Sequence, residues 1–208
     1  MASRLPWKSS RTSLADMPLH LETDRLILRP FQDADVQLFS EYRSDPEVAR
    51  YQSWETPYSL AQAAKFISAL HTVQPGTPGE WLQIAIELKT TGLLVGDCAF
   101  CVLAKEPQQA EIGFTLARRH QRNGYAGEAV TALLEYLFSG LQLHRVRAIC
   151  DVENLASARL LERIGMRLEG HFIESVWFKG RWSSEFWYAV LSTEWASKKN
   201  LNPYLHPL

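Results

Sequence analysis

Alternation of apolar and polar positions along the chain predicts strands, and apolar stripes with helical spacing predict helices. The clearest strand is Trp81–Leu88, where leucines and isoleucines share one face and Gln83 and Glu87 lie on the other. Comparable runs predict further strands at residues 21–30, 93–103, 110–117, 145–151, 167–177 and 185–191. Helical stripes are predicted within residues 33–45, 59–70, 129–140 and 158–165.

The order of these elements is strand, two helices, three strands, helix, strand, helix and two strands. Consecutive strands without an intervening helix favour antiparallel pairing over βα units. The pattern therefore predicts a single α+β domain with a mixed, mostly antiparallel sheet of six to seven strands, flanked by about four helices. The domain is expected to span residues 19–195, with a flexible extension at 1–18 and a tail at 196–208.

Composition narrows the function classes. The 208 residues include 22 basic and 23 acidic side chains, and this net charge of −1 argues against nucleic-acid binding through bulk charge. No apolar run approaches the roughly 20 residues that cross a bilayer, so no membrane partner is expected. Cys98, Cys101 and Cys150 lie in apolar runs and lack metal-ligand partners, which favours core positions, no metal and a cytoplasmic setting.

The segment 111–128, EIGFTLARRHQRNGYAGE, is the most informative one for chemistry. A strand leads into a basic loop and then into a helix whose start contains Gly124 and Gly127. Free backbone N–H groups at a helix start bind anions, and glycine lets an anion approach the backbone closely. The GxxxxGK[ST] and GxGxxG patterns are absent, which disfavours nucleoside triphosphates and dinucleotides. A pyrophosphate site is therefore predicted, with a solvated basic loop as the alternative.

Several segments resemble, in the same order, those of the GNAT acyltransferases. Gln121–Ala126 matches the family's [QR]-x-x-G-x-[GA] pyrophosphate loop. Five further segments are similar to the branch that contains the ribosomal-protein alanine N-acetyltransferases: LETDRLILRP at 21–30, DPEV at 45–48, DVENLASARLLERIGMRLEG at 151–170, GRW at 180–182 and YAVL at 188–191. The resemblance covers about residues 19–195 and implies a GNAT-type domain with a V-shaped cleft between the central strands.

The resemblance also implies which residues hold acetyl-CoA, as a co-substrate. The pantetheine arm would pair, as an added strand does, with the backbone of Phe114, Thr115, Leu116 and Ala117. Asn154 would contact CoA, and Ser157 its sulfur. The pyrophosphate would lie on the loop and helix start formed by Gln121, Arg122, Asn123, Gly124, Tyr125, Ala126 and Gly127.

A catalytic base and an acid are implied by the same resemblance. A carboxylate at about the position of Glu111 often takes the ammonium proton in the family, and Ser157 would bond to or protonate the departing thiolate. From the residues alone, Glu111 could equally be a surface carboxylate opposite a neighbouring strand, and Asn154 and Ser157 could simply start a helix.

Two positions depart from the family pattern. Many relatives carry a tyrosine acid where this chain has Leu161, so Ser157 or water is expected to replace it. In the closing hairpin, relatives often carry aspartate two residues after the tryptophan; here that position is Ser184, and Glu185 follows. A shift of one residue reverses the strand face that carries the acid.

The sequence leaves the amine acceptor open. The leading expectation is acyl transfer from acyl-CoA to a primary amine, such as a protein N-terminal amine, by direct attack in a ternary complex. A small-molecule acceptor (an aminoglycoside, a polyamine or an amino acid) and a catalytically weak CoA-binding module are the alternatives. Acyl-CoA and the amine are the expected partners, and a homodimer remains open.

Overall fold

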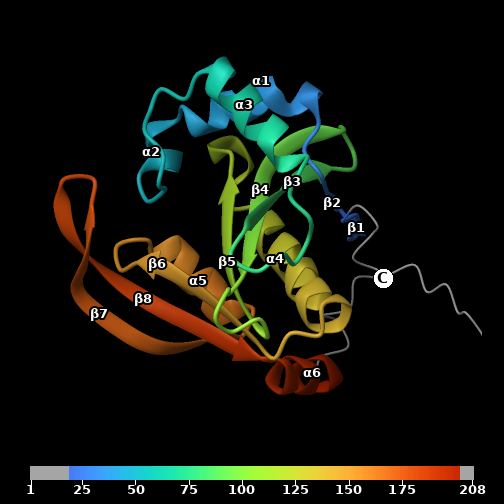
Figure 1. The fold of residues 1–208 in the computed structure, drawn as a ribbon, viewed down its shortest axis with the longest axis vertical. Helices are drawn as coiled ribbons and strands as arrows, with labels where there is room; N and C mark the ends of the chain where they lie inside the picture. The colour runs from blue at the N-terminus through green and yellow to red at the C-terminus, as the bar shows by residue number, and fades with distance from the viewer. Residues whose placement is uncertain (1–18, 202–208) are drawn as a thin grey trace, which may run out of the picture.

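Eight strands form one sheet in the part of the chain that the computed structural model describes, residues 19–201 (Figure 1). Their order is β1-β2-β3-β4-β5-β6-β8-β7, and every neighbouring pair is antiparallel except β5 with β6. This confirms the expected mixed α+β sheet. The strands span Leu21–Glu22 (β1), Leu26–Arg29 (β2), Trp81–Leu88 (β3), Leu93–Val102 (β4), Gln109–Leu116 (β5), Arg145–Asp151 (β6), Arg167–Phe178 (β7) and Arg181–Leu191 (β8).

The sheet has more strands than the six to seven expected, because residues 21–30 form two short strands rather than one. Thr23 turns the chain between them: its N–H donates to the Leu26 carbonyl at 3.0 Å, and its hydroxyl accepts from the Leu26 N–H at 2.9 Å. Such local side-chain bonds offer the backbone an alternative to the strand ladder. β8 also begins earlier than expected, so β7 and β8 form a long hairpin (Figure 1).

Six α-helices accompany the sheet within residues 19–201, where about four were expected. One additional helix directly follows the first expected one: the Asp45 side chain accepts from the Glu47 N–H and caps a short helix that begins at Pro46. The expected domain boundary at residue 195 falls inside α6. The helices span Val36–Arg43 (α1), Pro46–Ala49 (α2), Leu60–Leu70 (α3), Tyr125–Glu135 (α4), Leu155–Arg163 (α5) and Ser192–Leu201 (α6), with short turns at Asp33–Asp35 (η2), Arg118–His120 (η3) and Tyr136–Gly140 (η4).

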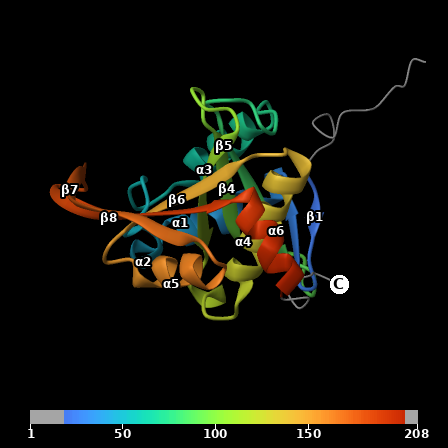
Figure 2. The ribbon, with the colours of Figure 1, turned by 90° about the horizontal axis from the view of Figure 1, so that it is seen from below.

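Helices cover both faces of the sheet, and each face has its own hydrophobic core (Figure 2). The larger core packs α4 and α5 against the central strands around Leu133, Leu134 and Leu161. The second core packs α1 and α3 against the opposite face around Phe39, whose ring contacts several other aromatic rings. Among these described helices, none has the length and apolar character needed to cross a membrane.

β5 and β6 pair over a short stretch and then diverge. Their partners run only from Gln109 with Arg145 to Ile112 with Ala148. β5 continues to Leu116 and β6 to Asp151, but these later residues do not pair with each other. The end of β5 therefore has an open side toward β6, which agrees with the expected V-shaped cleft between the central strands.

A bulge in β4 supports the open end of β5. Val95 is an extra residue relative to β3, and its carbonyl accepts from the Ala117 N–H at 2.9 Å. At the next residue, Gly96, a Cβ would lie 2.2 Å from the Thr115 carbonyl oxygen. Only glycine lets the two strands approach this closely. The position of Thr115 beside the cleft thus depends on the missing side chain of Gly96.

Candidate active site

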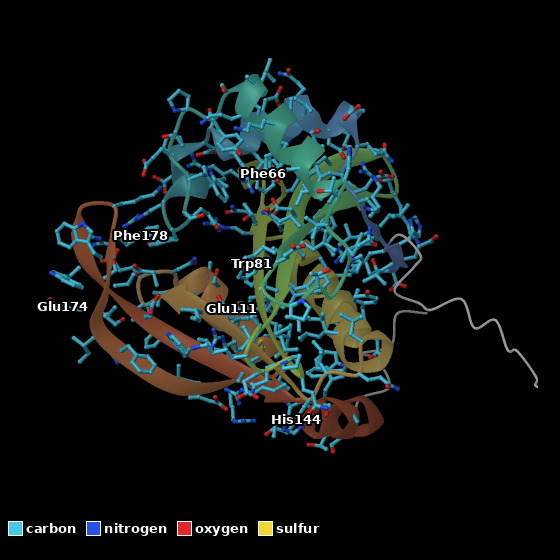
Figure 3. The ribbon with its side chains drawn as sticks, in the orientation of Figure 1. Phe66, Trp81, Glu111, His144, Glu174 and Phe178 are labelled. Atoms are coloured by element: carbon cyan, nitrogen blue, oxygen red, sulfur yellow. The ribbon has the colours of Figure 1, made fainter. Side chains whose placement is uncertain are left out.

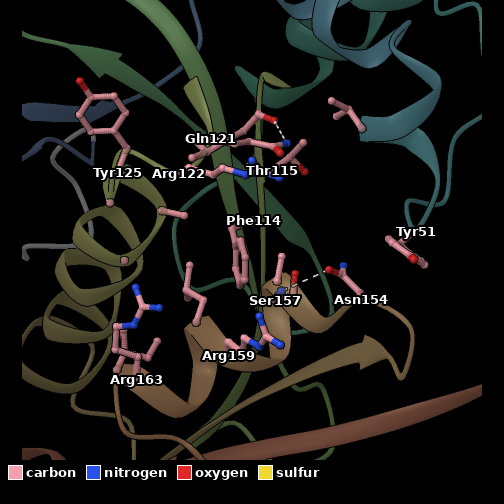
Figure 4. Close-up of a pocket in the computed structure, with 18 of the residues that line it drawn as sticks. Tyr51, Phe114, Thr115, Gln121, Arg122, Tyr125, Asn154, Ser157, Arg159 and Arg163 are labelled. Carbon is pink, nitrogen blue, oxygen red and sulfur yellow. Dashed lines mark hydrogen bonds between the residues drawn. The ribbon is translucent and has the colours of Figure 1, made fainter. Parts of the chain in front are cut away.

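A cavity of about 520 Å³ opens where β5 and β6 diverge (Figure 4). The end of β5 lies at its centre, and its walls are the loop before α4, the start of α4, one side of α5 and the segment around α2. Its lining residues are Glu47, Val48, Tyr51, Gln52, Phe114, Thr115, Leu116, Gln121, Arg122, Gly124, Tyr125, Ala126, Gly127, Asn154, Ala156, Ser157, Arg159, Leu160, Arg163 and Ile164.

The start of α4 presents backbone N–H groups to this cavity. Gly124, the N-cap, has a left-handed backbone with φ +81°, and Arg122 also has a positive φ of 65°. No hydrogen bond from the N-cap residue's side chain satisfies the first N–H groups, because glycine has none to offer. Unpaired N–H groups and the helix dipole favour an anion at this point. A Cβ at Gly127 would meet no atom within 4 Å, so the wall is open there.

Arg25 and Glu128 fasten the start of α4 to the turn between β1 and β2. The Glu128 carboxylate accepts from the Thr23 hydroxyl at 2.5 Å and lies 2.6 Å from the Arg25 guanidinium. Burial would raise the pKa of Glu128, but these hydrogen bonds outweigh it and hold the pKa below its usual value. Arg25 also donates to the Asn123 carbonyl at 3.0 Å and lies over the Tyr125 ring. The loop conformation therefore depends on a segment far away in the sequence.

Charge is unevenly distributed around the cavity. Arg122, Arg159 and Arg163 line it from the loop and from α5, and guanidinium groups suit phosphate oxygens. Glu47, on α2, is the one carboxylate among the described residues that line it. Sequence reasoning did not identify Arg159 and Arg163. Their spacing of four residues on a predicted helix was the signal that could have found them.

Asn154 and Ser157 stand at the start of α5. The Asn154 side chain accepts from the Ser157 N–H at 3.2 Å and caps the helix, and both residues also line the cavity (Figure 4). Leu161 differs from the expectation for its position: it is 1% exposed and lies in the larger core. Leu160 and Ile164 face the cavity instead. The position that carries tyrosine in many relatives therefore does not reach the cavity in this chain.

Most residues that the sequence places at the donor site lie on the cavity wall, and two do not. Ala117 is buried in the second core, and its N–H bonds to the β4 bulge. Asn123 donates from its side chain to the carbonyls of His120 and Gln121, so it shapes the loop. The predicted residues on the wall are Phe114, Thr115, Leu116, Gln121, Arg122, Gly124, Tyr125, Ala126, Gly127, Asn154 and Ser157.

Glu111 is not among the lining residues and lies at the closed end of the cleft (Figure 3). It stands beside Arg147 in the parallel ladder, next to the last pair. Arg147 donates to Glu111 Oε2 from Nε at 2.9 Å and from Nη2 at 2.7 Å. The Glu111 side chain is 22% exposed, so this carboxylate is ion-paired and still reachable by solvent.

Glu185, the acid that stands one residue later than in the family pattern, lies on the same sheet face as Arg147. The Trp187 ring lies 5.0 Å from the Arg147 guanidinium carbon, and the Trp187 indole N–H donates to Glu185 at 3.2 Å. Ser184 belongs to the other face of β8, and its hydroxyl accepts from the Glu174 N–H at 2.9 Å. The one-residue shift therefore brings Glu185 to the face that carries Glu111.

The described residues contain no group of three or more His, Cys, Asp or Glu side chains placed to hold a metal ion. Cys98, Cys101 and Cys150 are free and buried. Burial, together with the neighbouring Arg119, lowers the pKa of His120 in η3. This histidine lies beside the basic loop and is not a lining residue of the cavity.

Comparisons with known proteins agree with this geometry. The family model described as an acetyltransferase (GNAT) domain matches residues 25–167. The N-acetyltransferase YnaD of Bacillus subtilis (strain 168) is 34% identical over 177 residues, which cover 85% of this chain and 99% of YnaD. A putative ribosomal-protein-serine acetyltransferase from Vibrio cholerae has a TM-score of 0.68 at 25% identity, covering 85% and 98% of the two chains.

A third similar protein is a spermidine N-acetyltransferase from Vibrio cholerae, whose structure holds CoA and spermine. Its TM-score is 0.70 at 22% identity, over 82% of this chain and 98% of that chain, and the likeness is one of fold. A cleft between diverging parallel strands, beside a helix start with unpaired N–H groups, suits an acyltransferase whose donor carries phosphates. This chain belongs to the GNAT acetyltransferase family, and it is an N-acetyltransferase of that family.

Replacement of Gly124 tests the anion site at the start of α4. Gly124→Asp is expected to weaken CoA binding at least about tenfold, roughly 1.4 kcal/mol, because it places a negative charge where phosphates would lie. Gly124→Asn is the matched control, since it has the same size and tolerates a left-handed backbone without the charge. Calorimetric titration with CoA checks both. Equal affinity of the two variants would contradict an electrostatic role for this position.

Proposed function

We propose that this chain transfers an acetyl or related acyl group from acyl-CoA to a primary amine, with a protein N-terminal amine as the first candidate acceptor. One observation carries the proposal: the unpaired end of β5 and the N–H groups of α4 open into the same cavity. A donor with an amide-bearing arm followed by phosphates matches that arrangement, because the arm can pair with a strand edge while the phosphates bind the helix start.

The donor would lie along the cavity in one direction. Its pyrophosphate contacts the N–H groups of the loop and of α4, with Arg122, Arg159 and Arg163 supplying charge. Its pantetheine arm follows the backbone from Leu116 back to Phe114. The thioester then arrives near the point where β5 and β6 meet, beside Ser157.

The reaction needs one proton acceptor and one group that stabilises the leaving sulfur. The amine nitrogen attacks the thioester carbonyl carbon, a C–N bond forms, and the C–S bond breaks in the collapse of the tetrahedral intermediate. Glu111 takes the proton from the amine, through water because its side chain lies outside the cavity wall. Ser157 donates a hydrogen bond or a proton to the thiolate. No covalent adduct with the enzyme is formed.

The acceptor would enter from the side of α2. Glu47, Tyr51 and Gln52 line the cavity there without a cationic residue among them, which suits an amine that arrives protonated. The names of two similar structures differ in the acceptor: one is called a putative ribosomal-protein-serine acetyltransferase, and the other is a spermidine N-acetyltransferase in complex with CoA and spermine. A polyamine is therefore the second candidate acceptor.

An acceptor screen tests the proposed function. The intact chain is incubated with acetyl-CoA and, separately, with N-terminal peptides, polyamines, amino acids and aminoglycosides. Release of the free CoA thiol above the rate without amine is expected for at least one peptide. Release with spermine or spermidine alone would move the assignment to a polyamine acceptor. Binding of CoA without release for any amine would instead support a CoA-binding module.

Glu111→Gln tests the base. The substitution keeps the size of the side chain and removes its ability to accept a proton, so kcat is expected to fall by roughly 10²–10⁴ at neutral pH. Glu106→Gln is the control, because Glu106 is an exposed glutamate in the turn before β5. The rate is measured across pH with the amine found in the screen. An unchanged pH–rate profile for Glu111→Gln would mean that another group or water takes the proton.

Ser157→Ala tests the group beside the sulfur. The CoA thiol has a pKa near that of free cysteine, roughly 8.5, so it departs fairly well without full protonation. The rate is expected to fall only about tenfold, as for the loss of one hydrogen bond. The backbone N–H that bonds to Asn154 remains in this variant. A thousandfold loss with normal CoA affinity would make Ser157 an essential acid, and no loss would leave it a helix-start residue.

A further inference from the structure

The contact between Glu111 and Arg147 differs from an ordinary surface ion pair in how its hydrogen bonds are distributed. Both donors of Arg147, Nε and Nη2, bond to the same carboxylate oxygen, Oε2 of Glu111. The other oxygen, Oε1, accepts no hydrogen bond from residues 19–198, the part of the chain whose side chains the structure describes. Oε2 is thus occupied by two hydrogen bonds, whereas Oε1 is available to accept a proton.

Arg147 is itself held in place from two directions. Its backbone is in β6, where it pairs with Glu111 on one side and with Ala189 of β8 on the other. Its guanidinium lies over the ring of Trp187, with the guanidinium carbon 5.0 Å from the ring centroid. The Trp187 ring is tethered in turn by the hydrogen bond from its N–H to Glu185. A guanidinium confined in this way imposes one orientation on the carboxylate that it binds.

We propose that Arg147 is a positioning residue for Glu111: it binds Oε2 and leaves Oε1 as the oxygen that receives the amine proton. This inference rests on the proposed function, in which Glu111 is the base. Arg147 does not touch the acyl donor or the amine, because it is not a lining residue of the cavity. It acts on the rate only through Glu111.

A purely structural role for Arg147 predicts a different result. An exposed ion pair between neighbouring strands usually adds little to stability, and its loss acts on the whole fold rather than on one carboxylate. The pair of Arg145 with Glu169 provides a comparison on the same strand. Both guanidinium groups bond a glutamate through two nitrogens, and their side chains are 24% and 28% exposed. Arg145 is two residues from Arg147, but its partner is not the proposed base.

A double-mutant cycle separates the two roles, because residues that act through each other give non-additive effects. The rates of Arg147→Met, Glu111→Gln and the double variant are measured with the amine found in the acceptor screen. Arg147→Met is expected to lower kcat about tenfold or more, with the KM for acetyl-CoA unchanged. The double variant is expected to match Glu111→Gln alone. Arg147→Lys, which keeps the charge but has one donor nitrogen instead of three, is expected to recover part of the rate.

The Arg145→Met control and its double variant with Glu111→Gln are measured in parallel. Any fold-decrease in kcat from Arg145→Met is expected to multiply with the fold-decrease from Glu111→Gln, because the two residues act independently. Thermal melting and CoA affinity verify that every variant is folded. The positioning role is overturned, and the base assignment is not, if Arg147→Met lowers kcat by the same factor in the Glu111→Gln variant as in the wild type. The same holds if Arg147→Met does not lower kcat at all. If Glu111→Gln itself keeps the wild-type rate, the base assignment fails and the positioning role with it. If the wild-type chain releases no CoA with any amine, the proposed function fails first.

Discussion

The parallel pairing of β5 with β6 stops after Ile112 and Ala148, and the candidate site depends on that interruption. A ladder that continued to the ends of both strands would pair the backbone of β5 beyond Ile112 and leave no strand edge for a ligand. It would also close the space between α4 and α5, which pack against the two diverging strands on one face of the sheet. The cleft is therefore a consequence of unmade hydrogen bonds in the middle of an otherwise continuous sheet.

Two distant contacts keep this interrupted region in shape. Gly96 allows β4 to approach Thr115, so the end of β5 is held by β4 although it has lost β6. Arg25 and Glu128 then join the start of α4 to the first strands of the sheet. The strand edge and the helix start are thus supported from the same side of the cleft. A ligand that spans both would find them at a fixed separation.

The sequence predicted most strands, the α+β class and the helix start at Gly124, because alternation, helical stripes and glycines are local signals. It missed what depends on side chains meeting across the fold. α6 carries no marked apolar stripe, and it is anchored by Trp195, which packs on Phe138 and bonds to Glu135. The burial of Leu161 and the position of Arg163 on the cavity wall likewise follow from how α5 is rotated against the sheet, which a motif does not specify.

The three buried cysteines have a practical consequence for a protein that works on a thioester. Burial raises the pKa of the thiol in Cys98 and Cys101, and raises that of Cys150 to about 11, so each thiol stays protonated near neutral pH. A protonated, enclosed thiol is a poor nucleophile toward a reactive acyl donor or a thiol-specific dye. The cysteines of the folded chain are therefore shielded from acylation by the donor. A chromogenic thiol reagent added during turnover would report the thiol of the released CoA with little signal from the protein itself.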